Sequence, residues 1–426
     1  MREDIKQRIE EIDAGQSPSG YKTHHRVGVL PSDWDMNPLG EVSVQLTEKA
    51  GDQELETLSI SAGVGFVNQA QKFGKELSGK QYVNYTVLRP GDFSYNKGNS
   101  KTYPQGCIYR LEEREIAAVP NVFNSFRLLD SICNSDFYVH LFINGFMNHQ
   151  LYRLINAGVR NDGLLNLYND DFYGCLLPVP PLTEQQKIAV ILNHCDKVIE
   201  LKRELIEEER KRKKWLMQNL LDPDSGVRLQ GFESSWTITR VKDMGIIVTG
   251  TTPPTEKKEY YEDGLYPWVT PTDINRKYTT LTERSLSSSG LVKGRTLPEK
   301  TLLVTCIASI GKNTILMKKG SCNQQINAII PFSNHDVEFL YYMMENSKNY
   351  FMKYAGTTAT PIISMKGFSN MKFLLPSSIE EQIAIATVIA AQDVKIDLLE
   401  QELSQWQQKK KALMQLLLTG IVRVSV

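Results

Sequence analysis

Residues 210–221, RKRKKWLMQNLL, return almost unchanged as residues 407–418, QQKKKALMQLLL, 197 positions further along the chain. Upstream of this segment, Glu184-Gln185 returns as Glu381-Gln382 at the same spacing. A chain that carries the same segments twice is predicted to fold as an internal pseudo-dimer, with two similar modules facing two similar targets. The repeat also includes Ile188-Ala189 and Ile385-Ala386 upstream, and Gly226-Val227-Arg228-Leu229 and Gly420-Ile421-Val422-Arg423-Val424 downstream.

Each copy of the repeated segment ends a stretch that we expect to be one long helix, over residues 182–221 and 379–418. Thr183 and Ser378 are the expected N-caps, because each stands between a proline stop and acidic residues. Apolar residues recur in alternating steps of four and three, at seven of ten positions in the first helix and eight of ten in the second. This period is typical of a coiled-coil seam. We therefore predict two antiparallel helices that pack on each other as a spacer, each of roughly 57 Å.

Two alternatives to this pairing are independent surface helices, or helices that each pair with another protein. Five polar residues interrupt the apolar seam, and they would either fix its register or mark where a partner joins. These residues are Lys202, Glu209, Lys213, Gln392 and Lys410.

Two mixed regions of about 150 residues each accompany the helices and read as α+β modules. Each opens on a tryptophan (Trp34, Trp236) and closes on Leu-Leu-Pro, whereas their interiors hardly resemble one another. The expected strands are 82–88, 301–307 and 327–331, and the expected helices are 2–13, 136–154 and 336–354. The predicted organisation is an N-terminal extension (1–26), a first module (27–181), a central helix (182–225), a second module (226–378) and a C-terminal helix (379–426).

Composition agrees with a folded, water-soluble protein: of 426 residues, 41% are hydrophobic and 23% are charged. Two or three domains are expected at this length. No apolar run is long enough to cross a membrane, no secretory leader is evident, and the six cysteines form no Cys-x-x-Cys pair. We expect a cytoplasmic protein with free thiols and no membrane association.

Charge is distributed unequally although the net charge is zero. Residues 27–181 contain 12 Lys+Arg against 17 Asp+Glu, whereas residues 229–378 contain 17 against 12. An anion-binding role is therefore easier to assign to the second module than to the first.

Motifs of catalysis are not found. Gly311-Lys312 lacks the remaining residues of a phosphate-binding loop, and no Gly-x-Ser-x-Gly elbow or Asn/Asp-Pro-Pro-aromatic motif occurs. The six histidines have no metal-ligand spacing. We expect a binding protein that is not an enzyme and holds no cofactor or metal of its own.

Polar loops with nucleic-acid character stand mainly in the second module. Threonine hydroxyls, backbone N–H groups and lysines suit phosphates, and glutamine amides can read base edges, although for each loop alone a solvated turn is the simpler interpretation. The candidates there are Thr251, Thr252, Lys257, Lys258, Thr270, Thr272, Lys293, Arg295, Ser309, Lys312, Gln324, Gln325 and Thr358. In the first module they are Lys72, Lys75, Lys97, Asn99, Lys101 and Arg160.

Taken together, these segments resemble the specificity (S) subunits of type I restriction–modification enzymes. The similarity covers the chain from about residue 27. It is carried by Pro-Pro-Leu-Thr-Glu-Gln-Gln-Lys-Ile-Ala (180–189), Glu-Glu-Gln-Ile-Ala-Ile-Ala (380–386), the duplicated Lys-Lys-x-Leu-Met-Gln-x-Leu-Leu, Gly-Leu-Tyr-Pro-Trp-Val-Thr-Pro-Thr-Asp-Ile (264–274) and Gly-Thr-Thr-Ala-Thr-Pro (356–361).

The resemblance implies two target recognition domains, each reading half of a bipartite sequence in double-stranded DNA, held apart by the antiparallel helices. It also implies docking of two methyltransferase (modification) subunits and of restriction/translocase subunits. S-adenosylmethionine and ATP would bind to those partners. The first module departs from the pattern, because it is acidic and lacks a Pro-Trp-Val-Thr-Pro segment.

Two other functions remain as alternatives. A non-catalytic assembly scaffold would use the helices to recruit partners and would show no DNA sequence preference. An enzyme in its own right would transfer methyl groups or cleave DNA alone.

Overall fold

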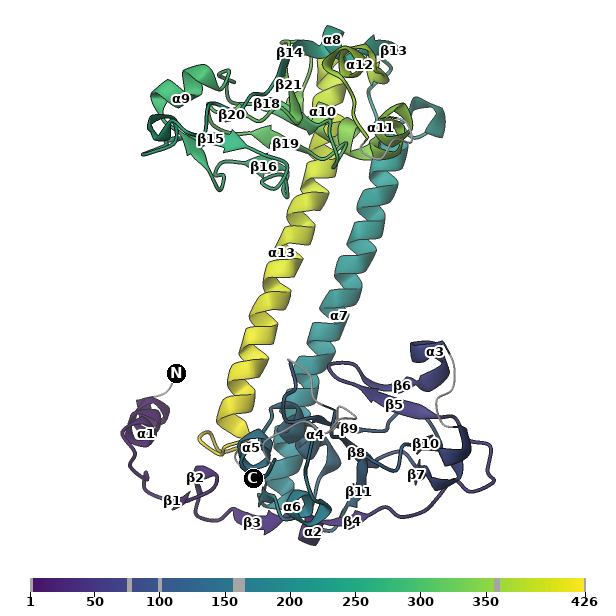
Figure 1. Cartoon of the computed structure of the whole chain (residues 1–426), viewed down its shortest axis with the longest axis vertical. Coiled ribbons are helices and arrows are strands. Elements are labelled where there is room, and N and C mark those ends of the chain that lie inside the picture. Colours follow the sequence, from purple (N-terminus) through teal and green to yellow (C-terminus); the bar gives the residue numbers. More distant parts are fainter. Residues whose placement is uncertain (1–2, 75–78, 99–101, 156–164, 356–360, 425–426) are drawn as a thin grey trace. The chain divides into compact units, whose positions relative to one another are not determined.

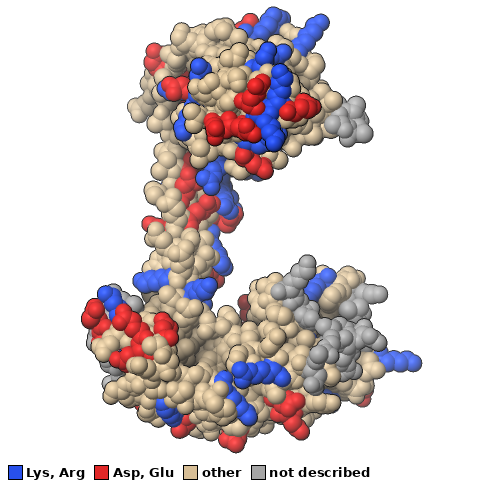
Figure 2. Space-filling view, turned by 60° about the vertical axis from the view of Figure 1, so that its left-hand side comes forward, with Lys and Arg blue, Asp and Glu red and all other residues tan. Residues whose placement is uncertain are grey.

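The computed structural model describes residues 3–74, 79–98, 102–155, 165–355 and 361–424 (Figure 1). The chain divides into two compact units: unit 1 contains Met1–Lys202 and Glu402–Val426, and unit 2 contains Arg203–Gln401. Each unit therefore combines one globular module with part of both long helices. The charged side chains on one face are shown in Figure 2. Within the described ranges, no helix is long and apolar enough to cross a membrane.

Unit 1 is built on an antiparallel sheet with the strand order β4-β11-β8-β9. Beside it, β3 pairs with β12, so that the start and the end of the module lie together. The frame consists of β3 (Asp35–Pro38), α2 (Leu39–Val42), β4 (Ser43–Gln45), β8 (Phe93–Asn96), β9 (Cys107–Arg110), β11 (Asn124–Leu128), α4 (Ser135–Ile143), α5 (Asn148–Leu154), α6 (Asn169–Tyr173) and β12 (Leu176–Val179).

Unit 2 repeats this frame in the order β14-β21-β18-β19, with β16 added at one edge. The pair β13–β22 corresponds to β3–β12. The frame consists of β13 (Trp236–Arg240), α8 (Val241–Met244), β14 (Gly245–Thr249), β18 (Thr301–Thr305), β19 (Asn313–Leu316), β21 (Ile326–Pro331), α10 (Val337–Asn346), α11 (Lys348–Ala355), α12 (Met365–Asn370) and β22 (Lys372–Pro376).

The two modules differ in the segments inserted into this frame. Unit 1 inserts β5 (Leu58–Ser61), β6 (Gly65–Asn68), α3 (Gln69–Phe73), η1 (Gly79–Asn84), β7 (Thr86–Leu88) and β10 (Ala117–Val119), and it begins with α1 (Glu3–Asp13), β1 (Tyr21–His24) and β2 (Gly28–Pro31). Unit 2 inserts η3 (Lys258–Tyr260), β15 (Tyr266–Val269), β16 (Tyr278–Thr279), β17 (Ser285–Leu286), α9 (Ser288–Lys293) and β20 (Ser321–Cys322), and a short η2 (Pro223–Ser225) precedes it. The predicted combination of similar ends and divergent interiors is confirmed.

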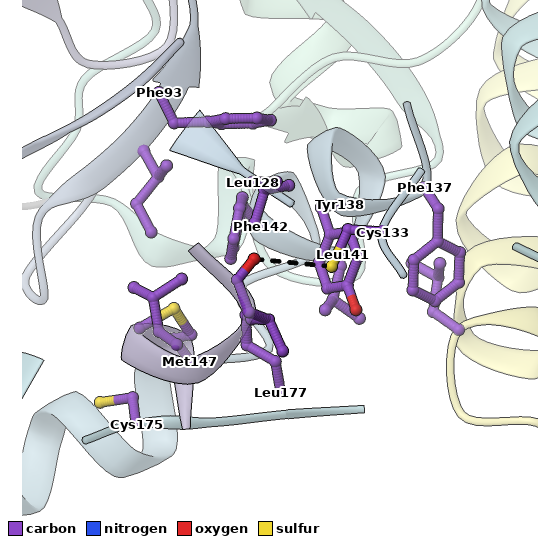
Figure 3. Close-up of a cluster of buried hydrophobic side chains, with 14 of the residues drawn as sticks. Phe93, Leu128, Cys133, Phe137, Tyr138, Leu141, Phe142, Met147, Cys175 and Leu177 are labelled. Carbon is purple, nitrogen blue, oxygen red and sulfur yellow. Dashed lines mark hydrogen bonds between the residues drawn. The ribbon is translucent and has the colours of Figure 1, made fainter. Parts of the chain in front are cut away.

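The core of unit 1 lies between the sheet, α4 and the helix ends. Phe93 and Phe126 stack with ring centroids 5.4 Å apart, and Phe142 meets Phe126 edge-on. Side chains of α4 fill the neighbouring space, as Figure 3 shows for Phe137, Tyr138, Leu141 and Phe142. Burial of such side chains is the main stabilising contribution to the fold. The corresponding core of unit 2 contains Phe339, Tyr342, Phe351 and Phe368.

The long helices are α7 (Leu182–Leu220) and α13 (Ile379–Leu417), and they run antiparallel within each unit (Figure 1). In unit 1 the first turns of α7 pack on the last turns of α13, through Ile188 and Leu192 against Met414 and Leu417. In unit 2 the contacts are Met217 and Leu220 against Ile385 and Ile389. No position of either predicted seam is exposed, which confirms the 3.5-residue pattern.

Ion pairs and hydrogen bonds cross the seam where polar residues interrupt it. Lys202 bonds Glu402 at 2.6 Å and Lys410 pairs with Asp196, both in unit 1. In unit 2, Lys213 lies 2.5 Å from Asp393, and the amide of Gln392 donates to Glu209 at 2.6 Å. All five interrupting residues thus have a partner on the facing helix, which favours the interpretation that they fix register. The pairs Lys410–Asp196 and Lys213–Asp393 occupy equivalent positions of the repeat.

A buried glutamate near the start of each long helix bonds an arginine that follows the end of the other helix. In unit 1, Glu184 accepts two bonds of 2.8 Å from Arg423 and one of 3.0 Å from the indole of Trp34. In unit 2, Glu381 accepts from Arg228 at 2.9 and 3.1 Å. The glutamate side chains are 0 and 1% exposed. We call these two sites the Glu–Arg fastenings.

The glutamine after each buried glutamate bonds the globular module. Gln185 accepts from the N–H of Asn134 at 2.7 Å, and Gln382 accepts from the N–H of Asp336 at 3.0 Å. Asn134 and Asp336 are the N-caps of α4 and α10. In each repeated Glu-Gln pair, the glutamate bonds the arginine that follows the other long helix. The glutamine bonds the N-cap residue of a helix in the globular module.

Several expected boundaries are corrected by the structure. The single helices expected over 136–154 and 336–354 are each two helices; in unit 1 Gly145 separates them with a φ of +73° that a left-handed turn requires. The strand expected over 82–88 is β7 only, because η1 occupies its first part. Thr183 is not a cap, since α7 already begins at Leu182, whereas Ser378 accepts from the N–H of Glu381 as predicted.

Replacing Arg423 with alanine would leave the buried carboxylate of Glu184 without its charged partner. Because breaking one side of a buried ion pair costs about 3–5 kcal/mol, we expect the free energy of unfolding to fall by about that amount. Urea unfolding followed by tryptophan fluorescence measures this loss.

Arg210→Ala is the matched control. Arg210 also bonds two glutamates, but its side chain is 52% exposed and theirs are 60 and 45% exposed. Such a surface pair contributes less than about 1 kcal/mol. Equal losses in the two variants would contradict the role that we assign to the fastening.

The stability of unit 1 should decrease in mild acid because of His140. Burial lowers its pKa below the ordinary value of 6.5, and Lys410 adds to this, although Asn193, Asp196 and Asp136 oppose it. The unfolded chain therefore takes up the proton first, so stability falls as pH drops below about 6.5 toward the folded-state pKa. Urea midpoints at about pH 7.5 and about pH 5 measure this. His140→Gln should reduce the difference, and the exposed His149→Gln should leave it unchanged; the reverse result would refute the assignment.

Candidate nucleic-acid interface

Two loops of unit 2 meet where β14 ends and β21 begins. The N–H of Gly250 donates to the carbonyl of Ile326 at 3.0 Å, and the N–H of Thr251 donates to the carbonyl of Cys322 at 2.9 Å. The loop that follows β14 is therefore tied by its backbone to the loop between β20 and β21. Both loops are among those predicted from the sequence.

A third loop and an arginine join the same place. The N–H of Asn323 donates to the carbonyl of Val269 at 2.9 Å, which brings in the loop that begins at Thr270. Arg295 donates from Nη1 to the carbonyl of Thr249 at 2.8 Å and has a positive φ of 59°. A non-glycine residue in this conformation is uncommon and concentrates at functional sites. We call residues 249–252, 270–273 and 323–325 together with Arg295 the loop cluster.

The side chains of the loop cluster hold one another at hydrogen-bond distance. Thr252 Oγ1 donates to Gln324 Oε1 at 2.5 Å, and Thr270 Oγ1 lies 2.8 Å from Thr272 Oγ1. Gln325 Oε1 accepts from the amide of Asn323 at 3.0 Å. Gln324, Thr272 and Arg295 are exposed, so their remaining donors and acceptors face solvent. Such a set of amides, hydroxyls and a guanidinium matches base edges and phosphates.

The turn after β18 lies beside the loop cluster. The N–H of Cys306 donates to the carbonyl of Gln325 at 2.8 Å. Within this turn the hydroxyl of Thr305 accepts from the N–H of Lys312 at 3.0 Å, and Ser309 and Lys312 are exposed. These two predicted residues are thus neighbours of the amide-bearing loop.

Three predicted lysines belong to another part of unit 2. Lys257 and Lys258 lie at the start of η3 and Lys293 ends α9. These two helices are joined by the N–H of Ser287, which donates to the carbonyl of Tyr260 at 2.9 Å. These lysines thus stand on η3 and α9 rather than in the loops that form the loop cluster, and Lys293 is two positions before Arg295. On the face seen in Figure 2, basic and acidic side chains of unit 2 lie close together.

The candidates of unit 1 are on separate elements. Lys72 lies in the last turn of α3, with its ammonium 5.0 Å from the ring centroid of Phe73. Lys97 follows β8 and donates to Leu167 O and Asn169 Oδ1, both at 3.3 Å. Lys75, Asn99, Lys101, Arg160 and, in unit 2, Thr358 lie outside the described residues.

Burial makes the thiols of unit 2 unreactive. It raises the pKa of Cys306 and of Cys322 to about 12, so neither is a thiolate at neutral pH. In the part of the chain that the structure describes, no group of three His, Cys, Asp or Glu side chains could hold a metal ion. The chemistry that the loop cluster offers is hydrogen bonding and charge.

Sequence reasoning does not single out Asn327, although its Oδ1 accepts from Thr249 Oγ1 at 2.7 Å directly below the loop cluster. A comparison of the two modules strand by strand would have found it, because the register of β11 places an asparagine, Asn124, at the equivalent position. The modules are too divergent there for the residues to be matched without strand pairing.

Comparisons with known proteins by sequence and by structure point to the same family. Residues 233–407 match the family described as the type I restriction modification DNA specificity domain. The specificity subunit of the type I restriction enzyme HindI from Haemophilus influenzae is 33% identical over 148 residues, or 33% of this chain. That match covers 32% of the relative, so only about a third of its length is represented.

Two solved structures share the fold over most of the chain. A chain from work on complex assembly and conformational transition of the type I R-M system has a TM-score of 0.60 at 18% identity, with 92% of this chain and 99% of that chain covered. The HsdS subunit from Thermoanaerobacter tengcongensis has a TM-score of 0.53 at 17% identity, with 92 and 98% covered. The predicted fold class, two α+β modules with a pair of antiparallel coiled-coil helices and an internal repeat, is confirmed.

Gly250→Ala should open the loop cluster. A Cβ at this position would collide with the carbonyl oxygens of Cys322 and Asn323. Overpacking of this kind costs about 1–3 kcal/mol, and the amide of Thr251 should exchange its hydrogen faster. Gly40→Ala is the control, since its Cβ would meet Tyr173 at an ordinary 3.5 Å. Unchanged exchange at Thr251 would show that the loops are not held as described.

Proposed function

We propose that this chain, which belongs to the family of type I restriction–modification specificity subunits, reads a bipartite sequence in double-stranded DNA. Each unit would read one half of the target. Both long helices would set the number of unread base pairs between the halves.

The observation that carries this proposal is the repetition of one frame with different inserts. Both units have the same strand order and the same Glu–Arg fastening, whereas the loops above the sheet differ in length and composition. A shared frame with two different surfaces suits a protein whose two units dock on DNA by the same geometry but recognise different half-sites. It also suits duplex DNA, which presents an equivalent groove at each helical turn.

In unit 2 the loop cluster supplies the chemistry for reading. Gln324 carries an exposed amide that can bond adenine through two atoms, and Arg295 and Lys312 can contact phosphate or guanine. Backbone bonds hold the three loops in place, so little conformational freedom is lost when DNA binds.

We assign the methyl transfer and the DNA cleavage to partner subunits. The duplicated helices would dock two modification subunits, and restriction/translocase subunits would join the complete enzyme. S-adenosylmethionine and ATP would then be bound by those partners, in the cytoplasm. The alternative of a scaffold without DNA specificity would leave the polar loop cluster without a role.

Methylome sequencing of the source strain, with the gene intact and deleted, tests this function. Deletion should remove one bipartite adenine-methylation motif and leave all others. A methylome that does not change while the partner subunits are expressed would favour the scaffold.

Gln324→Ala should make sequence recognition less strict in one half-site only. Loss of a bidentate base contact costs about 1–3 kcal/mol, so methylation should spread to sites altered at one position of that half.

Lys312→Ala should weaken binding about equally for all sequences and lower its salt dependence, because a phosphate contact carries no sequence information. Exposed Lys372, on β22, gives the matched control Lys372→Ala, which should bind as the unmodified chain does. Unchanged binding in both test variants would exclude the loop cluster as the reading site.

A further inference from the structure

Equivalent backbone bonds align the two modules residue by residue. The N–H of Leu129 donates to the carbonyl of Val42 in unit 1, and the N–H of Phe332 donates to the carbonyl of Met244 in unit 2, both at 2.9 Å. Each bond closes the same antiparallel pair, β11 with β4 and β21 with β14. Positions on these strands can therefore be matched by counting back from Leu129 and Phe332.

With this alignment, the residues of unit 2 that we propose to read DNA can each be matched to a residue of unit 1. Asn124, at the start of β11, takes the position of Asn327 on β21. Three residues earlier, Asn121 takes the position of Gln324. Across the sheet, Thr47 corresponds to Thr249, which pairs with Asn327.

A second pair of bonds aligns the ends of the central strands. The N–H of Leu165 donates to the carbonyl of Lys97 at 3.0 Å, and the N–H of Ile363 donates to the carbonyl of Cys306 at 2.8 Å. Lys97 of unit 1 is therefore equivalent to Cys306 of unit 2, which lies next to the loop cluster.

At this place unit 1 contains a polar cavity of about 300 Å³. Lys97 and Asn169 lie on one of its sides and are bonded to each other at 3.3 Å. Lys49 is exposed at its rim and lies 3.5 Å from the hydroxyl of Thr86. The polar side chains that line it are Gln45, Thr47, Lys49, Thr86, Lys97, Asn121, Asn124, Ser125 and Asn169.

One lining side chain has an unused donor. Asn124 is 5% exposed, and its Nδ2 donates to no acceptor among the described residues. A buried donor without an acceptor is unfavourable, so such groups usually have a partner. In unit 2 the equivalent Asn327 accepts a bond from Thr249. An acceptor on a ligand that enters the cavity could satisfy Asn124 after rotation of its amide.

We propose that this cavity is the DNA-reading site of unit 1, with Asn121 as the residue that reads a base edge. This inference rests on the proposed function and assigns the half-site of the first module. Asparagine bonds adenine through its N6 and N7 atoms, so Asn121 selects an A·T pair. Lys49 and Lys97 contact the adjacent phosphates.

The site explains how an acidic module binds an anion. Residues 27–181 are net negative, but two lysines and three asparagines line this one cavity. Lys72, on α3, is not among its lining residues. The inference therefore assigns binding in unit 1 to the end of the sheet.

The test uses the full chain expressed with its partner subunits. In Asn121→Ala, methylation should spread to sites altered at one position of the half-site that Gln324→Ala leaves intact. Binding of the assembled complex to its cognate duplex should weaken roughly 5- to 150-fold. Lys49→Ala should weaken binding without changing the motif. Asn144→Ala, at the exposed end of α4, is the matched control and should change neither.

The outcomes separate this inference from the proposed function. An unchanged motif in Asn121→Ala, or relaxation of the same half-site that Gln324→Ala relaxes, overturns the inference alone. Absence of any sequence-specific methylation with the unmodified chain overturns the proposed function. If Asn121→Ala lowers thermal stability, Asn121→Gln provides the second variant. Its amide can still bond adenine but extends from a side chain one methylene longer, so it should weaken recognition of the first half-site and leave the second half-site unchanged.

Discussion

A buried carboxylate bonded to an arginine from the other half of the repeat is the constraint on which the rest of the structure depends. Glu184 and Glu381 are almost fully buried at the starts of α7 and α13, where an unpaired charge would be strongly unfavourable. Arg423 and Arg228 satisfy them from segments that follow the opposite helix. These bonds hold the start of each long helix against the segment that follows the other long helix. The adjacent glutamines bond the N-cap residues of α4 and α10, and so connect the same place to the core of each module.

This constraint explains why the fold could be predicted from sequence. Three repeated features of the sequence each have a contact in the structure: the Glu-Gln pair, the glycine and arginine after each long helix, and the 3.5-residue apolar period. Local patterns were less informative. Thr183 and Ser378 have the same appearance as caps, but Pro180 and Pro181 allow α7 to begin one residue before Thr183, so only Ser378 caps its helix. The division of α4 from α5 depends on the left-handed conformation of Gly145, which composition alone does not indicate.

The candidate site was predictable only in part, because a site on a sheet edge is assembled by strand pairing. Loops with runs of threonine and glutamine identified Thr251, Thr270 and Gln324, and the structure brings them together. Positive charge was a weaker guide: Lys257 and Lys293 stand on η3 and α9 rather than in those loops. In unit 1, Asn121 has no basic or repeated neighbour that would attract attention. Its equivalence to Gln324 follows from the register of β11 and β21, which becomes visible only when the backbone bonds are known.

The division of the chain also has a consequence for its synthesis on the ribosome. Unit 2 is one continuous segment, whereas unit 1 needs residues 402–423 to supply the facing helix and the arginine that bonds Glu184. Those residues are translated after the whole of unit 2. The module that is encoded first is therefore completed second, and until then its buried glutamate and the apolar face of α7 lack their partners. Nascent chains of this protein should depend on chaperones longer in their amino-terminal half, opposite to the usual order in which amino-terminal domains fold first.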